Sequence, residues 1–236
     1  MRKQQTGFTL IEIAIVLVII GLLLGGVLKG QELITSARVR NLISVQDGIK
    51  AAFFGFQDRF RALPGDYTSA VTAGTVTGNI TGATVNGNGN GRIEVAATPA
   101  NGSVVQENIA VWDQLSHAGF MNGTYTWAAA AADTTSPKNP YGIYLDLQYD
   151  AVYGLGTITK HNLKSGGQIP VEIIAEVDRK IDDGAPYTGS FQFSVYAGNG
   201  TAPSAPGAGS CTSAAALAGV WQPTGGNTNC GAASIF

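Results

Sequence analysis

The sequence predicts an α+β chain: a long N-terminal α-helix, membrane-spanning in its first half, that packs on a small antiparallel β-sheet head. Three observations predict this class. They are an unbroken apolar run near the N-terminus, a helical apolar period behind it, and a C-terminal part where short helix and strand patterns alternate with Gly-rich turns. The 236 residues suffice for one or two domains. We expect four segments: a basic leader (1–7), a transmembrane helix (8–30), an amphipathic helix (31–62) and a globular head (63–236).

Composition and charge exclude several classes of protein. Charged residues make up 13% of the chain, against about 25% in average globular domains. The formal net charge is −2, so no basic field exists for nucleic acid and no direct nucleic-acid binding is expected. Two Cys and two His are too few for a structural zinc site. No phosphate loop, dinucleotide loop or nucleophile motif stands in a strand–helix context, so we expect no enzyme and no catalytic residues.

The apolar run covers residues 8–28 and contains one ionisable group, Glu12. As a helix it would be about 32 Å long, enough to cross a bilayer. Arg2 and Lys3 precede it, and positive flanks stay cytoplasmic, so the bulk of the chain is expected outside the cytoplasm. An ordinary cleaved signal has an apolar core of about 7–15 residues and a small-residue cleavage site, which this run lacks. A plain signal anchor remains an alternative, but it leaves Glu12 unexplained.

Glu12 indicates a function for the run. A carboxylate costs roughly 2.5–3.5 kcal/mol at the centre of a membrane span, and less one turn from its start. Such a group is a functional-site hypothesis whose partner should be named. Lys29 is about 25 Å away along a helix. Cleavage between Gly7 and Phe8 would create an α-amine one turn before Glu12, and that pair would be neutral within one chain or between neighbouring chains.

The hexapeptide Gly7-Phe8-Thr9-Leu10-Ile11-Glu12, between a short basic leader and an apolar helix, resembles the type IV pilin and pseudopilin family. The resemblance implies that a prepilin peptidase cuts after Gly7 on the cytoplasmic side and methylates the amine of Phe8. It also implies that Glu12 pairs with the amine of an adjacent subunit as a filament assembles. Gly7 suits this role because a peptidase cutting here favours a residue without a side chain.

Glycines recur in the predicted transmembrane and filament-core helix. They form two G-x-x-x-G spacings, Gly21/Gly25 and Gly26/Gly30, which allow helices to approach closely. Each also weakens the helix by up to about 1 kcal/mol relative to Ala. In related pilins this stretch can lose helical structure inside the filament. Here Lys29 replaces the Pro often present near this point, so local melting between Gly21 and Gly30 is a hypothesis.

The helical period continues through residues 31–62. Apolar side chains recur there at spacings of three and four: Leu42, Val45, Ile49, Phe53, Phe56 and Phe60. Pro64-Gly65 should end the helix near Leu63. We expect its second half to pack on the head. A membrane anchor followed by an unrelated amphipathic helix is the alternative.

In the head, residues 68–104 are rich in Thr, Gly and Asn and are expected to form a long loop or short hairpins rather than core. Two helices are expected. One covers 105–118 with Gly119 as its C-terminal cap, and the other opens at Pro170 and ends at Asp183-Gly184. Strands are expected at 141–149, 152–160 and 190–197, the last with Phe191, Phe193 and Val195 on one face.

Cys211 and Cys230 are the only cysteines. Export places them in an oxidising compartment, where a disulfide is the default. The loop encloses 18 residues, for which chain-entropy arguments give about 3 kcal/mol of stabilisation. Pilins commonly carry such a C-terminal loop. Two free thiols are the alternative.

Two polar clusters have competing interpretations. Asn86, Asn88, Asn90 and Glu94 resemble the opening of a calcium loop, but Asn replaces the acidic ligands and Ala97 stands where a bidentate Glu would fall. A chain of Asn-Gly turns is the favoured interpretation, with weak calcium binding as the alternative, and no other cofactor is expected. The acids of 178–183 are interpreted as a solvated helix end rather than a catalytic group.

We therefore expect a structural pilin of a type IV pilus-like filament. Its partners would be copies of itself, the prepilin peptidase and the pilus or secretion assembly machinery. Before assembly it would be a single-pass protein of the bacterial inner membrane with a cytoplasmic N-terminus, and afterwards part of an extracellular fimbrium or a periplasmic filament. A type II secretion pseudopilin and a membrane-anchored surface-binding protein are the alternatives.

Overall fold

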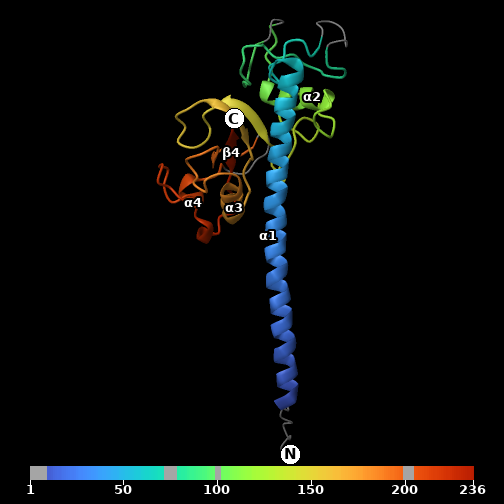
Figure 1. Ribbon diagram of the computed structural model, residues 1–236. Coiled ribbons are helices and arrows are strands. Elements are labelled where there is room, and N and C mark those ends of the chain that lie inside the picture. Colours follow the sequence, from blue (N-terminus) through green and yellow to red (C-terminus); the bar gives the residue numbers. More distant parts are fainter. Residues whose placement is uncertain (1–9, 72–78, 99–101, 199–204) are drawn as a thin grey trace, which may run out of the picture. The chain divides into compact units, whose positions relative to one another are not determined.

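The computed structural model describes residues 10–71, 79–98, 102–198 and 205–236. The chain forms two compact units, Met1–Arg38 and Val39–Phe236. The first is helical over its described residues. The second contains the sheet and the shorter helices (Figure 1), and it also contains the buried hydrophobic clusters.

Helix α1 (Leu10–Phe60) contributes residues to both units and includes the described part of the predicted 8–30 segment and most of 31–62. It is helical from Gly21 through Gly30 in this single chain, which leaves melting inside a filament as a hypothesis. It ends at Phe60 rather than near Leu63. Arg61, which follows, has a left-handed backbone with φ 55°, so the chain turns before Pro64 is reached.

In the second unit, α1 buries one face at helical spacing, as the sequence predicts. The buried residues are Val39, Leu42, Gln46, Ile49, Ala52, Phe53 and Phe56. Two hydrophobic clusters form on this face. One joins Val39 and Leu42 to α3 (Val171–Ile181) and β3 (Phe191–Phe193), and the other joins Ile49, Phe53 and Phe56 to α2 (Glu107–His117) and β1 (Asp146–Asp150). The head's core is therefore built directly on this part of α1.

The sheet has four antiparallel strands in the order β1-β2-β4-β3, where β2 is Lys160–Lys164 and β4 is Ala232–Ile235. The strands predicted at 141–149 and 152–160 were placed too early in the chain. Gly154 and Gly156 take left-handed φ of 53° and 71° in the connection, so β2 begins only at Lys160. Strand β4 was not predicted. Beyond β3, Val195 is exposed rather than buried with Phe191 and Phe193.

Both predicted helices of the head are present. Gly119 follows α2 with φ 81° and donates its N–H to Ser116, which suits a glycine after a helix end. Pro170 precedes α3 as predicted. Two short helical turns complete the unit, α4 (Ala208–Cys211) and a 3₁₀ turn at Pro223–Gly225.

The expectation that residues 68–104 lie outside the core was wrong for much of the described segment. Buried apolar side chains from this stretch are Ala70, Ile80, Ala83, Ile93 and Ala97. The first four belong to the cluster around Phe56 and Trp112. The segment has little regular structure, but short Gly-rich turns bring single apolar residues into the core.

Candidate assembly helix and polar sites of the head

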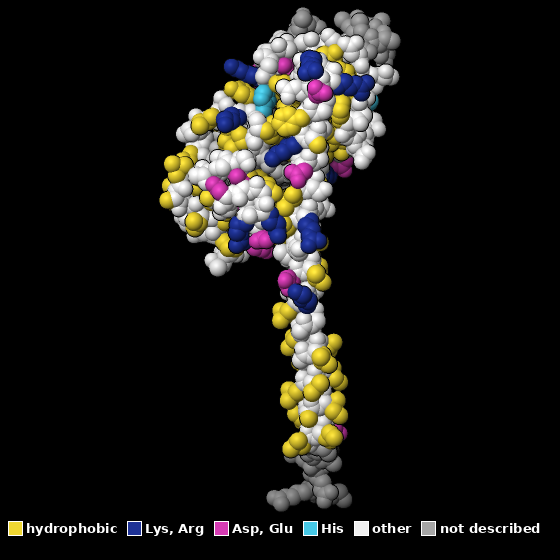
Figure 2. All heavy atoms as spheres, viewed as in Figure 1, with side chains coloured by type: hydrophobic (Ala, Val, Ile, Leu, Met, Phe, Trp, Pro, Cys, Tyr) yellow, Lys and Arg dark blue, Asp and Glu magenta, His cyan; other side chains and the backbone are white. Residues whose placement is uncertain are grey.

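The helix of the first unit exposes almost every apolar side chain that it carries. Leu10, Leu22 and Leu28 are 88%, 73% and 67% exposed, and no residue of its most apolar 18-residue window is buried. Figure 2 shows this as a helix surface dominated by hydrophobic side chains. Each Å² of apolar surface left in water costs roughly 25 cal/mol, so this surface needs lipid or other helices around it. Among the described residues this is the single helix long and apolar enough to cross a membrane.

A few charged residues and four glycines interrupt the apolar surface of this helix. Glu12 lies in the first turn of α1 as described, where the helix dipole favours an acid. The next charges, Lys29 and Glu32, form an exposed ion pair at 2.7 Å where the apolar run ends. At Gly21, Gly25, Gly26 and Gly30 an added Cβ would meet nothing within 4 Å. No described contact within the chain therefore requires glycine at these four positions. Their surface is free to contact a neighbouring helix. Gly7 and Phe8 lie outside the described residues.

The sequence comparisons point to the same segment. The family model described as the prokaryotic N-terminal methylation motif matches residues 2–28. A curated relative, a "Fimbrial protein" of Neisseria meningitidis serogroup B (strain ATCC BAA-335 / MC58), is 28% identical over 130 residues, which cover 54% of this chain and 74% of that protein.

Both findings support the type IV pilin family. The layout of the chain, a long apolar N-terminal helix with a small antiparallel sheet, is that of a type IV pilin, and the family consists of structural subunits rather than enzymes. No solved structure matches the chain significantly.

This pilin-like chain closes its C-terminal part with a disulfide between Cys211 and Cys230, and both cysteines are fully buried. Inside the loop Trp221 pairs with Thr212, whose hydroxyl lies 2.7 Å from that of the buried Tyr187. The disulfide therefore lies inside the hydrophobic cluster that joins Val39 and Leu42 to α3 and β3, and the loop that it closes is packed on that cluster.

The Asn-Gly stretch uses its amide oxygens to close turns. Asn88 Oδ1 accepts the Asn90 N–H at 2.9 Å, and Asn90 Oδ1 accepts the Arg92 N–H at 2.9 Å. Asn86 Oδ1 accepts the Val71 N–H at 2.6 Å, and Asn90 Nδ2 donates to Glu94 at 2.7 Å. These contacts support the turn interpretation, and calcium binding by this loop remains a prediction.

Two buried acids, Asp66 and Glu107, hold this stretch in place. Asp66 accepts the N–H groups of Asn90 and Gly91 at 3.0 and 2.9 Å, and Glu107 accepts those of Asn88 and Glu94 at 2.8 and 3.1 Å. Burial raises the pKa of Asp66, and it raises the pKa of Glu107 to about 7 against the lowering effect of these N–H donors. The sequence offers Asp66 as a distant carboxylate that could join Glu94, whereas no motif marks Glu107.

A buried ion network on the sheet was also missed. Lys164 Nζ lies 2.8 Å from Asp146 and 2.6 Å from Asp150, and its side chain is 1% exposed. Asp146 also accepts a hydrogen bond from the Asn108 amide of α2 at 2.8 Å. Asp146 and Lys164 are opposite each other in the β1–β2 register, so pairing across the ladder brings these charges together.

The acids at the end of α3 differ from their sequence interpretation. Asp178 is fully buried, so a solvated helix end is wrong for this residue, whereas Asp183 is exposed. Trp221 Nε1 donates to Asp178 Oδ2 at 2.6 Å. Burial raises the pKa of Asp178 to about 7, although the N–H groups of Trp221 and Gly184 oppose this shift. The sequence predicts the helix but not that Asp178 contacts Trp221 of the disulfide loop.

Proposed function

We propose that this chain is a structural pilin of a type IV pilus-like filament, and that a prepilin peptidase removes residues 1–7 and methylates Phe8. The observation that carries the proposal is the exposed apolar helix of the first unit, with Glu12 in its first turn, inside the methylation motif. Such a surface is stable in lipid before assembly and in a bundle of identical helices afterwards.

Extraction into a filament would change the hydrophobic free energy little, because apolar helix contact replaces apolar lipid. Helix packing and the pairing of Glu12 with the Phe8 amine of a neighbouring subunit would then set direction and register. The four exposed glycines would let neighbouring helices approach. Assembly machinery outside this chain would supply the work.

Before assembly the protein would sit in the bacterial inner membrane with its N-terminus in the cytoplasm. Arg2 and Lys3 support that orientation through the positive-inside rule. The partners of this proposal are other copies of the chain, the prepilin peptidase and the assembly machinery.

The substitution Glu12→Val tests the assembly step. The variant should still insert in the membrane, since the span becomes more apolar, but it should not enter filaments when it is the sole subunit. Glu32→Val is the matched control, because Glu32 is an exposed acid of the same unit that pairs with Lys29 outside the apolar run. Filaments of normal length and number built from the Glu12→Val chain would overturn the proposal.

The choice of a surface pilus over a secretion pseudopilin rests on the size of the head and on its C-terminal disulfide loop. The relative named a fimbrial protein favours the same choice. Electron microscopy of sheared surface material, with mass spectrometry of the dominant subunit, tests it. Surface filaments made of this chain are expected. A secretion defect on deletion of the gene, with no surface filament containing the chain, would favour the pseudopilin.

A further inference from the structure

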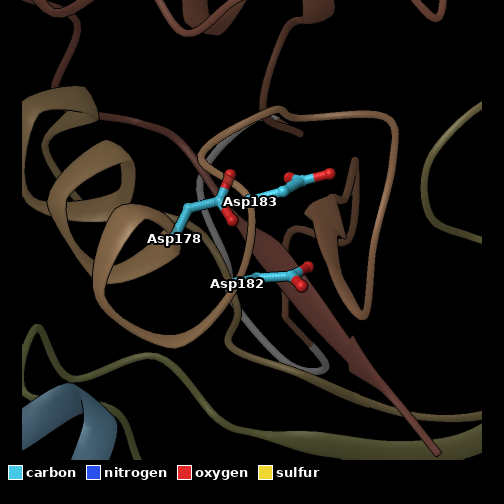
Figure 3. A group of neighbouring side chains, drawn as sticks. All are labelled: Asp178, Asp182 and Asp183. Atoms are coloured by element: carbon cyan, nitrogen blue, oxygen red, sulfur yellow. The ribbon is translucent and has the colours of Figure 1, made fainter.

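We propose that Asp178, Asp182 and Asp183 form a calcium site at the C-terminal end of α3, and that bound calcium fixes the turn after α3 to the disulfide loop. One carboxylate oxygen from each residue lies within 4.8 Å of the others. Figure 3 shows Asp178 on the helix and the other two acids on the chain that follows it. The methylation motif at residues 2–28 does not reach these acids, and the proposal is independent of filament assembly.

The buried Asp178 supplies an independent reason to expect a ligand. Its side chain is fully buried, and Oδ1 has no hydrogen-bond partner of good geometry among the described residues, although the Gly184 N–H lies near the carboxylate. The other oxygen, Oδ2, accepts the Trp221 indole N–H at 2.6 Å. A buried carboxylate oxygen without a partner is costly, because it has lost its water and gained nothing in exchange. Coordination of a cation would satisfy it.

The surrounding charges favour a cation. Three acids crowd the negative end of the α3 dipole, where basic groups are normally preferred. The two bases of the last turn, Arg179 and Lys180, pair with Glu176 instead. Lys50 is a base close enough to feel the charge of Asp182. Burial lowers the pKa of Lys50, and the charges of Asp47 and Asp182 oppose this lowering. One lysine still leaves the three carboxylates with excess negative charge.

The spacing is compatible with calcium. Two oxygens bound to one Ca²⁺ at about 2.3–2.6 Å lie no more than about 5 Å apart, and the three carboxylate oxygens lie within 4.8 Å of one another. The exposed Asp183 leaves room for waters to complete the coordination shell of Ca²⁺.

The hydrogen bonds of the three acids show what the ion would hold together. Asp182 Oδ2 accepts the N–H of Phe191 at 2.7 Å, and Asp183 Oδ1 accepts that of Ala185 at 2.9 Å. Asp178 holds Trp221, which lies inside the Cys211–Cys230 loop. Calcium would therefore connect α3, the turn that leads into β3 and the disulfide loop.

Thermal unfolding of the full mature chain in detergent micelles, stripped with EGTA and titrated with CaCl₂, tests the proposal. At calcium tenfold above Kd the unfolding temperature should rise by about 3–6 °C. Asp178→Asn and Asp182→Asn should each abolish most of that rise. In EGTA, Asp178→Asn should be at least as stable as the wild type, because an amide keeps an acceptor for Trp221 without a buried charge.

Two control variants separate this site from others. Asp58→Asn changes an exposed acid of α1 and should keep the full calcium response. Glu94→Gln changes an acid of the Asn-Gly stretch and should also keep the full calcium response. A calcium response that is lost only in Glu94→Gln would overturn the proposal. Terbium emission excited through tryptophan should appear with the wild type, be displaced by Ca²⁺ and vanish in Asp182→Asn. A wild type without calcium response, or a response unchanged in both Asp variants, would also overturn the proposal.

Discussion

At the scale of single residues, each buried charge in the sheet has a specific partner, and Lys164 is the main example. Lys164 is held by Asp146, Asp150 and the side-chain carbonyl of Gln148, and its ammonium lies 5.3 Å from the centre of the Tyr196 ring. Such a network adds little stability when it is complete, but losing one member leaves the others buried and uncompensated. The charges therefore specify how β1 pairs with β2.

Lys164→Met should consequently lower the free energy of unfolding by about 3–5 kcal/mol, because Asp146 and Asp150 lose their counter-ion. Urea unfolding of the protein in micelles measures the effect. Lys180→Met is the matched control. It removes an exposed ion pair with Glu176 and should leave the urea midpoint nearly unchanged. Equal stability of the two variants would contradict the role given to the network.

Glu107 predicts how stability depends on pH. Burial raises its pKa from 4.5 to about 7, so the folded protein binds more protons than the unfolded chain between these values. This contribution to stability is present below about pH 4.5 and is lost as pH rises through about 7. In EGTA the urea midpoint should fall from pH 5 to pH 8. Asp178 adds to the fall, because its pKa is also raised to about 7.

Glu107→Gln should make that fall smaller, because a neutral side chain has no proton to lose. Glu172→Gln, a change on the exposed surface of α3, should leave the pH profile as it is. A midpoint that rises from pH 5 to pH 8 in the wild type would show that Glu107 is already ionised in the acidic range.

At the scale of elements, how well the sequence predicts each one depends on the length of its pattern. The period of α1 repeats over many turns, and α2 and α3 each have a boundary marked by Gly119 or Pro170, so these helices are visible in the sequence. Strands of three to five residues give no comparable signal. The register was missed because Lys164 lies beyond the strand predicted at 152–160, and nothing in the sequence places it opposite Asp146. Asp178 was missed because burial under Trp221 depends on a contact 43 residues away.

The disulfide loop is the element whose contribution to the free energy of unfolding is predicted most directly. Reduction, or Cys211→Ser with Cys230→Ser, should lower the free energy of unfolding by about 3 kcal/mol, as expected for a closed loop of 18 residues. Trp221 fluorescence should change, because its burial depends on this loop. Cysteines that alkylate in the native, unreduced protein would contradict the bond.

At the scale of the whole molecule, the chain combines two units with opposite solvent preferences. The unit Met1–Arg38 exposes an apolar helix, whereas Val39–Phe236 buries two apolar clusters and carries most of the chain's charges. The first needs lipid or other helices, and the second tolerates water. That division is what a filament subunit stored in a membrane requires. The sequence indicates the same two preferences, because a long apolar run and a Gly-rich remainder are properties of composition, although the boundary between the units lies at Arg38 and Val39.

The central claim is that a new amine at Phe8 neutralises Glu12 of a neighbouring subunit. Mass spectrometry of the N-terminal peptide from purified filaments tests it most directly. The account predicts a peptide that begins at Phe8 and carries one methyl group on its amine. Filaments whose subunits still begin with Met1, Arg2 and Lys3 would contradict it.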